Sequence, residues 1–187
     1  PWPPNRSWRL SLNSLPALPD PDGLLTVLTE RLRTQLAGRT ELGLIGIRTG
    51  GVWVAERLRL SLGAPLPLGT IDTAFYRDDY DQKGLHRGVK PSEIPFDVSG
   101  RDILLVDDVL YTGRTVRAAL DALFDQGRPA RVQLLVLIDR GWRELPIEAR
   151  YVGRMVQTHA NEIIEVKFQE IDGMEKVLLV EKMAQGA

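Results

Sequence analysis

Short apolar runs that alternate with helix-like segments constrain the fold of this chain more than any other feature. The runs at residues 42–47 (LGLIGI), 102–106 (DILLV) and 132–138 (VQLLVLI) lack the polar alternation of strands that have one wet face. Segments with hydrophobic residues at helical spacing separate these runs. A parallel sheet covered by helices on both faces produces this pattern. The sequence therefore predicts an α/β fold with a mostly parallel central sheet and flanking helices.

Capping residues and turn signals mark the limits of the other elements. We expect a first helix with its N-cap at Asp22 and its stop at Gly38, and a second helix that ends at Gly63. Residues 68–76 (LGTIDTAFY) are predicted to form a strand, and the C-terminal tail a hairpin that turns near Asp172. The apolar face of the first helix is expected to comprise Leu24, Leu25, Val27, Leu28, Leu32 and Leu36.

The composition is that of a globular protein without a global bias toward nucleic acid or membrane. The 187 residues include no cysteine and carry a formal net charge of −1, which excludes disulfides and thiol catalysis and favours the cytoplasm. No apolar run approaches a membrane span, and the first residues do not resemble a signal peptide. We expect a proline-rich arm at 1–21, one domain at 22–187, and within it a flexible loop at 76–96 that acts as a lid.

Two adjacent carboxylates, Asp107 and Asp108, follow the apolar run at 102–106. Ionised carboxylates are costly to bury without a partner, so both are expected to face solvent, a cation or a polar ligand at the end of the strand. Adjacent acceptors suit the vicinal hydroxyls of a ribose. After a short spacer, the residues 112–115 (TGRT) offer hydroxyls, backbone N–H groups and a helix start, which together favour an anion. A sugar with a 5-phosphate would satisfy both halves.

The combined string is more specific than either half. It is neither a Walker phosphate loop nor a dinucleotide fingerprint, because the sequence contains neither GxxxxGK[ST] nor GxGxxG. It resembles the phosphoribosyl pyrophosphate (PRPP) motif of type I phosphoribosyltransferases. The strings YRDD, VDDVLYTGRTVRAALDALFDQGRP, LVLIDRG and RELPI, in this order, are similar to those of the PyrR family of pyrimidine operon regulators and uracil phosphoribosyltransferases. Tyr111 strengthens this resemblance, since many other transferases carry an acidic residue at its position.

The resemblance implies a fold and a reaction. The fold is the three-layer type I phosphoribosyltransferase fold, with a flexible lid and a small C-terminal β hood. The reaction is the transfer of ribose 5-phosphate from PRPP to uracil, which yields UMP and pyrophosphate, with Mg²⁺ carried mainly by PRPP and water. Asp107 and Asp108 would hold the ribose hydroxyls and favour the cationic sugar. The 5-phosphate would lie in a loop formed by Leu110, Tyr111, Thr112, Gly113, Arg114 and Thr115.

Three further segments are implied in substrate binding. Arg77, in the 76–96 loop, is the third candidate catalytic residue because it could reach pyrophosphate. Asp139 and Arg140, after the run at 132–138, are the nearest candidates for the base, with an ordinary strand-end ion pair as the alternative. A glycine turn resembles the pyrophosphate loop, although relatives commonly have Thr-Arg-Gly where this chain has Thr-Gly-Gly. The turn consists of Arg48, Thr49, Gly50 and Gly51.

The resemblance leaves the balance of activities open. Some PyrR proteins bind pyrimidine-operon mRNA in the presence of UMP, so one alternative is an RNA-binding regulator with little catalysis. RNA-binding members usually have His where this chain has Trp142, which argues against RNA, although Arg143, Arg150 and Arg154 could form a basic patch. A phosphoribosyltransferase for another base is the second alternative. A homodimer or higher homo-oligomer is expected from the family.

Overall fold

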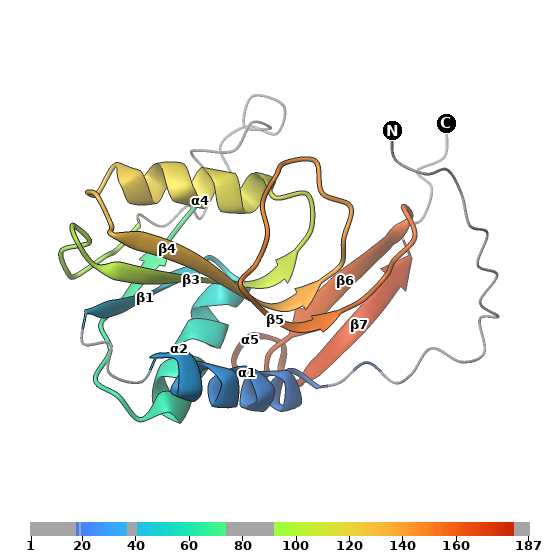
Figure 1. Ribbon diagram of the computed structural model, residues 1–187. Coiled ribbons are helices and arrows are strands. Elements are labelled where there is room, and N and C mark those ends of the chain that lie inside the picture. The colour runs from blue at the N-terminus through green and yellow to red at the C-terminus, as the bar shows by residue number, and fades with distance from the viewer. Residues whose placement is uncertain (1–17, 19, 37–40, 74–91, 182–187) are drawn as a thin grey trace.

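The computed structural model describes residues 18, 20–36, 41–73 and 92–181 (Figure 1). Most of the predicted arm at 1–21, Gly38, and the greater part of the 76–96 loop with Arg77 lie outside the described residues. The elements in chain order are α1 (Pro21–Leu36), β1 (Leu42–Ile47), α2 (Gly50–Leu62), β2 (Leu68–Ile71), β3 (Asp102–Leu110), α4 (Arg114–Phe124), β4 (Arg131–Asp139), β5 (Tyr151–Met155), β6 (Glu162–Lys167), α5 (Gln169–Asp172) and β7 (Lys176–Glu181).

A five-stranded sheet of order β2-β1-β3-β4-β5 forms the centre of the molecule. All neighbouring strands in it are parallel, which confirms the prediction from the apolar runs. The carboxyl ends of β1, β3 and β4 therefore meet along one edge of the sheet. In open α/β sheets this edge is where ligands bind.

Helices cover both faces of the sheet and complete the predicted three layers. α4 packs on one face, and α1 and α2 pack on the other (Figure 1). The core on the α4 face includes Ile45, Leu105 and Leu123, and the core on the opposite face includes Leu28 and Leu58. Each such side chain contributes about 1.5–3 kcal/mol when it is fully buried. None of the described helices is long and apolar enough to cross a membrane.

The C-terminal hood, residues 162–181, is a separate two-stranded sheet, as predicted. β6 and β7 pair in antiparallel fashion, and their connection contains the short helix α5, which ends at the left-handed Gly173 (φ 66°). Ile164, Phe168 and Val177 of the hood are buried in the same core as α1 and α2. The hood therefore packs on the main sheet's helical layer rather than extending the sheet itself.

Arg57, on α2, links the hood to both helices of that layer. Its guanidinium pairs with Glu170 (2.6 Å) and Glu175 (2.6 Å) of the hood and with Asp22 at the start of α1 (2.9 Å). Its side chain also lies over the ring of Phe168, 5.5 Å from the centroid. Hydrogen bonds to Glu175 and Glu170 raise the pKa of Arg57 above its ordinary value. The link therefore depends on a cation that does not titrate in the working range of the protein.

Some element limits differ from the sequence-based expectation. The N-cap of α1 is Asp20 rather than Asp22, because the Asp20 carboxylate accepts a hydrogen bond from the Gly23 N–H (2.7 Å). Val27, which was expected on the buried face, is 47% exposed. α2 ends at Gly63 as predicted, with φ at 65°. β2 is shorter than expected, and β5 was not predicted, since its five residues with a central glycine show no clear period.

Candidate functional site

The acidic pair lies inside strand β3 rather than beyond its end. β3 continues to Leu110, so sheet pairing holds the backbone on both sides of Asp107 and Asp108. Successive side chains of a strand point to opposite faces, which places Asp107 on the α4 side and Asp108 on the α2 side. Asp107 is only 6% exposed, whereas Asp108 is half-buried. The pair therefore does not stand beyond the end of the strand as expected, and Asp107 does not face solvent. Whether the two carboxylates face a cation or a polar ligand stays a prediction.

The electrostatics of the pair favour a proton or a ligand on Asp107. Burial, and then the neighbouring charge of Asp108, raise the pKa of Asp107 well above its ordinary value. Asp107 Oδ1 accepts a hydrogen bond from the Asp108 N–H (3.0 Å), and Asp108 Oδ1 accepts one from the Val109 N–H (2.9 Å). Within the described residues neither carboxylate forms an ion pair. The site thus holds two neighbouring carboxylates, and no cationic side chain of the described residues neutralises them.

The glycine turn at 48–51 packs directly against the acidic pair. A Cβ atom at Gly50 would lie 2.3 Å from Asp108 Oδ2, and one at Gly51 would lie 2.2 Å from the carbonyl oxygen of Val106. Only glycine permits this approach at either position. Both glycines belong to the first turn of α2, whose leading N–H groups have no partner within the helix. The predicted pyrophosphate loop and the predicted ribose site are therefore adjacent.

Arg48, at the start of this turn, lies toward β2. Its Nη2 group donates to Thr70 Oγ1 (3.0 Å), and its backbone N–H donates to the carbonyl of Ile71 (2.9 Å). The peptide bond between Arg48 and Thr49 is cis. The Nε atom of Arg48 is buried without a hydrogen-bond partner in the part of the chain that the structure describes. A buried cationic donor of this kind fits the border of an anion site.

The predicted phosphate loop, residues 110–115, leads from β3 into α4. Gly113 has φ at 92°, a left-handed conformation that favours glycine, and α4 begins at the next residue. The carbonyl of Thr112 accepts hydrogen bonds from the N–H groups of Glu144 (3.0 Å) and Leu145 (3.1 Å), which hold the loop from outside. Arg114 adds an ion pair to Glu144 (2.7 Å). The start of α4, which favours anions, thus lies at the same edge as the acidic pair.

Of the two predicted base residues, Asp139 ends β4 and Arg140 follows it, beside this loop. Asp139 pairs with Leu110 in the sheet register, and the Arg140 N–H donates to the Leu110 carbonyl (3.0 Å). Both side chains are buried, at 7% and 4% exposed. The Asp139 carboxylate forms an ion pair with Arg143, and the guanidinium of Arg140 lies over the ring of Tyr111, 3.9 Å from its centroid. The predicted site segments within the described residues thus lie together, and Arg77 lies outside the described residues.

Comparison with known proteins agrees with this geometry. The family model of the phosphoribosyl transferase domain matches residues 24–171. The Bifunctional protein PyrR of Pseudomonas fluorescens is 49% identical over 152 residues, which cover 80% of this chain and 90% of that protein. The protein of the same name from Pelotomaculum thermopropionicum is 48% identical over 169 residues, covering 87% of this chain and 93% of that protein. The chain belongs to the PyrR family of phosphoribosyltransferases.

Solved structures show the same fold in other members of the superfamily. A hypoxanthine-guanine phosphoribosyltransferase from Bacillus anthracis matches with a TM-score of 0.62 and 19% identity, over 80% of this chain and 86% of that one. A purine phosphoribosyltransferase from Pyrococcus horikoshii matches with a TM-score of 0.54 and 25% identity, over 73% and 82%. The predicted three-layer phosphoribosyltransferase fold is therefore confirmed for this PyrR chain.

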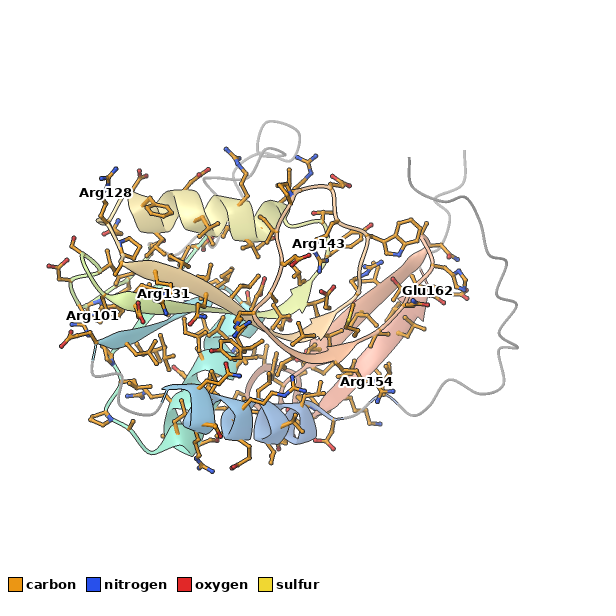
Figure 2. The ribbon with its side chains drawn as sticks, in the orientation of Figure 1. Arg101, Arg128, Arg131, Arg143, Arg154 and Glu162 are labelled. Atoms are coloured by element: carbon orange, nitrogen blue, oxygen red, sulfur yellow. The ribbon has the colours of Figure 1, made fainter. Side chains whose placement is uncertain are left out.

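Sequence reasoning missed the contacts of Arg143 with two candidate site residues, Tyr111 and Asp139. Arg143 was placed in a candidate basic patch, but its guanidinium donates to the carbonyls of Tyr111 (2.6 Å) and Ile147 (2.9 Å) and pairs with Asp139. Figure 2 shows Arg143 near the α4 layer and Arg154 well apart from it, near α1. These two arginines therefore do not share one patch. The only sign of the Asp139–Arg143 ion pair in the sequence was the four-residue spacing between an acidic and a basic residue at the end of the strand.

Proposed function

We propose that this PyrR chain is a uracil phosphoribosyltransferase that converts uracil and PRPP to UMP and pyrophosphate. The observation that carries the proposal is the close contact of the glycine turn with the acidic pair, where a Cβ at Gly50 would meet Asp108 Oδ2 at 2.3 Å. The acceptor pair lies between two helix starts, those of α2 and α4, which both favour anions. PRPP carries its groups in the corresponding order, with pyrophosphate, ribose and 5-phosphate in line.

Each segment then has one task in the reaction. The glycine turn, with Arg48, and Arg77 of the 76–96 loop bind the pyrophosphate that leaves C1 of the ribose. Asp107 and Asp108 bind the ribose hydroxyls and stabilise the positive charge that develops on the sugar. Residues 110–115 bind the 5-phosphate, while Asp139 and Arg140 border the base that forms the new bond to C1. Catalysis then rests on holding the reactants in line and on stabilising the charges that develop, and no covalent nucleophile is required.

The residues at this edge fit a magnesium ion that arrives with PRPP. Among the described residues no three acidic or histidine side chains lie close enough to hold a metal together. Asp107 and Asp108 nevertheless provide two carboxylates beside the glycine turn, which suits the water and hydroxyl ligands of Mg²⁺. The ion, when bound, would neutralise charge on the departing pyrophosphate.

Pyrophosphate release from PRPP and Mg²⁺ with uracil, orotate, hypoxanthine or guanine tests the proposal. We expect turnover with uracil only. The matched solved structures include purine transferases, so turnover with hypoxanthine and none with uracil would overturn the choice of base. Asp107→Asn combined with Asp108→Asn should abolish turnover while the circular dichroism spectrum stays unchanged. Retained turnover would remove both residues from the ribose site.

The second candidate function is UMP-responsive binding to the leader mRNA of pyrimidine genes. It is favoured by the relatives named as bifunctional PyrR proteins at 48–49% identity. Trp142 and the engaged side chain of Arg143 argue against it. A gel shift with leader RNA, with and without UMP and at two salt concentrations, decides the matter, since phosphate contacts weaken steeply with salt. Equal affinity for an unrelated RNA would contradict this function.

We further propose that residues 22–187 act as one domain, with 76–96 as its lid, and that the chain forms a homodimer or higher oligomer. The burial of hood residues in the same core as α1 and α2 supports the single domain. Analytical ultracentrifugation of the full chain tests the oligomer, and a purely monomeric sedimentation profile would refute it.

A further inference from the structure

We propose that Arg140 is a positioning residue that joins the phosphate loop to the hood and thereby sets the geometry of PRPP binding, an inference that rests on the proposed function. Its side chain is only 4% exposed. Among the described residues it has no ion pair, since Asp139 pairs with Arg143 instead. A buried guanidinium without a carboxylate partner is costly to keep in a fold, so its other contacts determine its role.

The side chain of Arg140 contacts two segments that are far apart in the sequence, the one around Tyr111 and the one from Thr158 to Glu162. It lies over the ring of Tyr111 in the phosphate loop, 3.9 Å from the centroid. Its Nε donates to Thr158 Oγ1 (3.3 Å), and its Nη2 donates to the carbonyl of Glu162, the first residue of the hood. The Glu162 carboxylate in turn accepts a hydrogen bond from the His159 N–H (2.6 Å). Arg140 therefore holds the start of the hood and the phosphate loop at a fixed separation.

The contact of Arg140 with the ring of Tyr111 should affect binding of the 5-phosphate rather than binding of the ribose. Arg143 donates to the backbone carbonyl of Tyr111 (2.6 Å), whereas Arg140 contacts its ring (3.9 Å to the centroid). Loss of that contact would let residues 110–113 relax and move the N–H groups that face the 5-phosphate. Asp107 and Asp108 are fixed independently by the pairing of β3 with β4. Arg140 should therefore act on substrate binding much more than on bond breaking.

The test compares Arg140→Met, which removes the charge and keeps the length, with Arg140→Lys, which keeps a cation. The matched control is Arg131→Met, because Arg131 begins β4, at the end of the strand away from Arg140 (Figure 2), and its side chain is 54% exposed. We expect Arg140→Met to raise the KM for PRPP and the Kd for UMP about ten- to thirty-fold, the size of a desolvated cation–π contact. The kcat should fall less than about three-fold, as for lost uniform binding. Arg140→Lys should recover part of the affinity, and Arg131→Met should match the wild type.

Substitutions of Tyr111 decide the matter if Arg140→Met fails to fold. Tyr111→Leu, which lacks a ring, should weaken UMP binding more than Tyr111→Phe does. Arg140→Lys added to Tyr111→Leu should have little further effect, because the contact is already lost. Fully additive losses in that double variant, or wild-type PRPP binding by a folded Arg140→Met, would overturn the proposal.

Calorimetric titration with UMP, or with PRPP and Mg²⁺ in the absence of a base, separates this inference from the proposed function. Failure of the wild type to turn over uracil would refute the uracil transferase alone. The binding constants of the Arg140 variants would still show whether this residue positions the phosphate loop. Unchanged constants beside normal turnover would refute the positioning role alone.

Discussion

The carboxyl group of Asp107 is buried beside a second carboxylate, and this raises its pKa in the folded protein. An aspartate in the unfolded chain has a pKa of about 3.9. Above that pH the unfolded chain has released a proton that the native chain still retains, up to the raised pKa of Asp107. The stability contributed by Asp107 is therefore complete below about pH 4 and is lost as the pH rises through the folded pKa.

We expect Asp107→Asn to stabilise the ligand-free protein at neutral pH while it abolishes turnover. The amide keeps the shape of the side chain and removes a charge that burial disfavours. The gain in the free energy of unfolding should be roughly 0.5–2 kcal/mol, the range of common stabilising substitutions. Urea denaturation at several pH values between about 5 and 8 measures it, and the gain should grow with pH. A variant that is less stable than the wild type at the alkaline end would contradict this account.

Gly50 is a second residue at this edge, and the neighbouring Asp108 carboxylate leaves no room there for a side chain. A Cβ at this position would lie 2.3 Å from Asp108 Oδ2, so Gly50→Ala must displace that carboxylate. We expect a loss of kcat/KM of about 100-fold, as for a small misplacement of a catalytic group. The matched control is Gly23→Ala in the first turn of α1, where the new Cβ would meet only the Asp20 side chain at 3.5 Å. That control should keep full activity and gain roughly 0.4–1 kcal/mol of stability.

At the scale of elements, the attachment of the hood depends on Arg57. Arg57→Met would leave Glu170 and Glu175 without their cation while it keeps a packing stem over Phe168. We expect a loss of roughly 1.5–3 kcal/mol, the range for hydrogen bonds to charged groups. Urea denaturation measures the loss, and hydrogen exchange should show faster exchange in β6 and β7 than in β1 and β3. Uniformly faster exchange across all strands would mean that the hood is not a separately attached unit.

An exposed ion pair provides the control for this substitution. Arg117→Met breaks the pair with Asp121 on α4, in which each side chain is 46% exposed. Such surface pairs contribute about 0.3–0.5 kcal/mol. The two substitutions remove the same charge, and the larger loss expected for Arg57→Met follows from the burial of Arg57 and its three-way contact.

The elements themselves were predictable where the signal is local. Continuous apolar runs identified β1, β3 and β4, and Gly63 identified the end of α2, because burial and capping leave marks within a few residues. The predicted start of α1 was wrong because two neighbouring residues could each cap the helix. Asp20 and Asp22 flank the same proline, and only the folded chain shows which one caps the helix. β5 is held mainly by pairing with β4, which no local period reveals.

For the candidate site too, features encoded in neighbouring residues were predictable and features that depend on tertiary contacts were not. The acidic pair and residues 110–115 form one contiguous string, so the sequence alone was enough to predict a ribose-phosphate site there. The burial of Asp107 was not predictable, since it depends on β3 continuing past the charges to Leu110. The contacts of Arg140 join Tyr111 and Glu162, which lie 29 residues before and 22 residues after it in the sequence. Such tertiary contacts have no signature at a fixed spacing.

At the scale of the whole molecule, the ligand should supply stability that the empty site lacks. Binding to the native state alone adds about 2.7 kcal/mol at a ligand concentration of 100 Kd. For a chain of 187 residues this corresponds to a rise in Tm of roughly 5–10 °C. We expect PRPP with Mg²⁺ to produce such a rise in the wild type and a much smaller one in Asp107→Asn, which lacks a charged acceptor for the ribose.

The order of the two melting temperatures should therefore reverse on titration with PRPP and Mg²⁺. Asp107→Asn should melt above the wild type without ligand and below it at saturation, because the charge that destabilises the free fold is the one that the bound substrate uses. Differential scanning calorimetry over a series of PRPP concentrations measures the crossing. Parallel shifts in both proteins would show that Asp107 takes no part in binding, and they would move the ribose site away from β3.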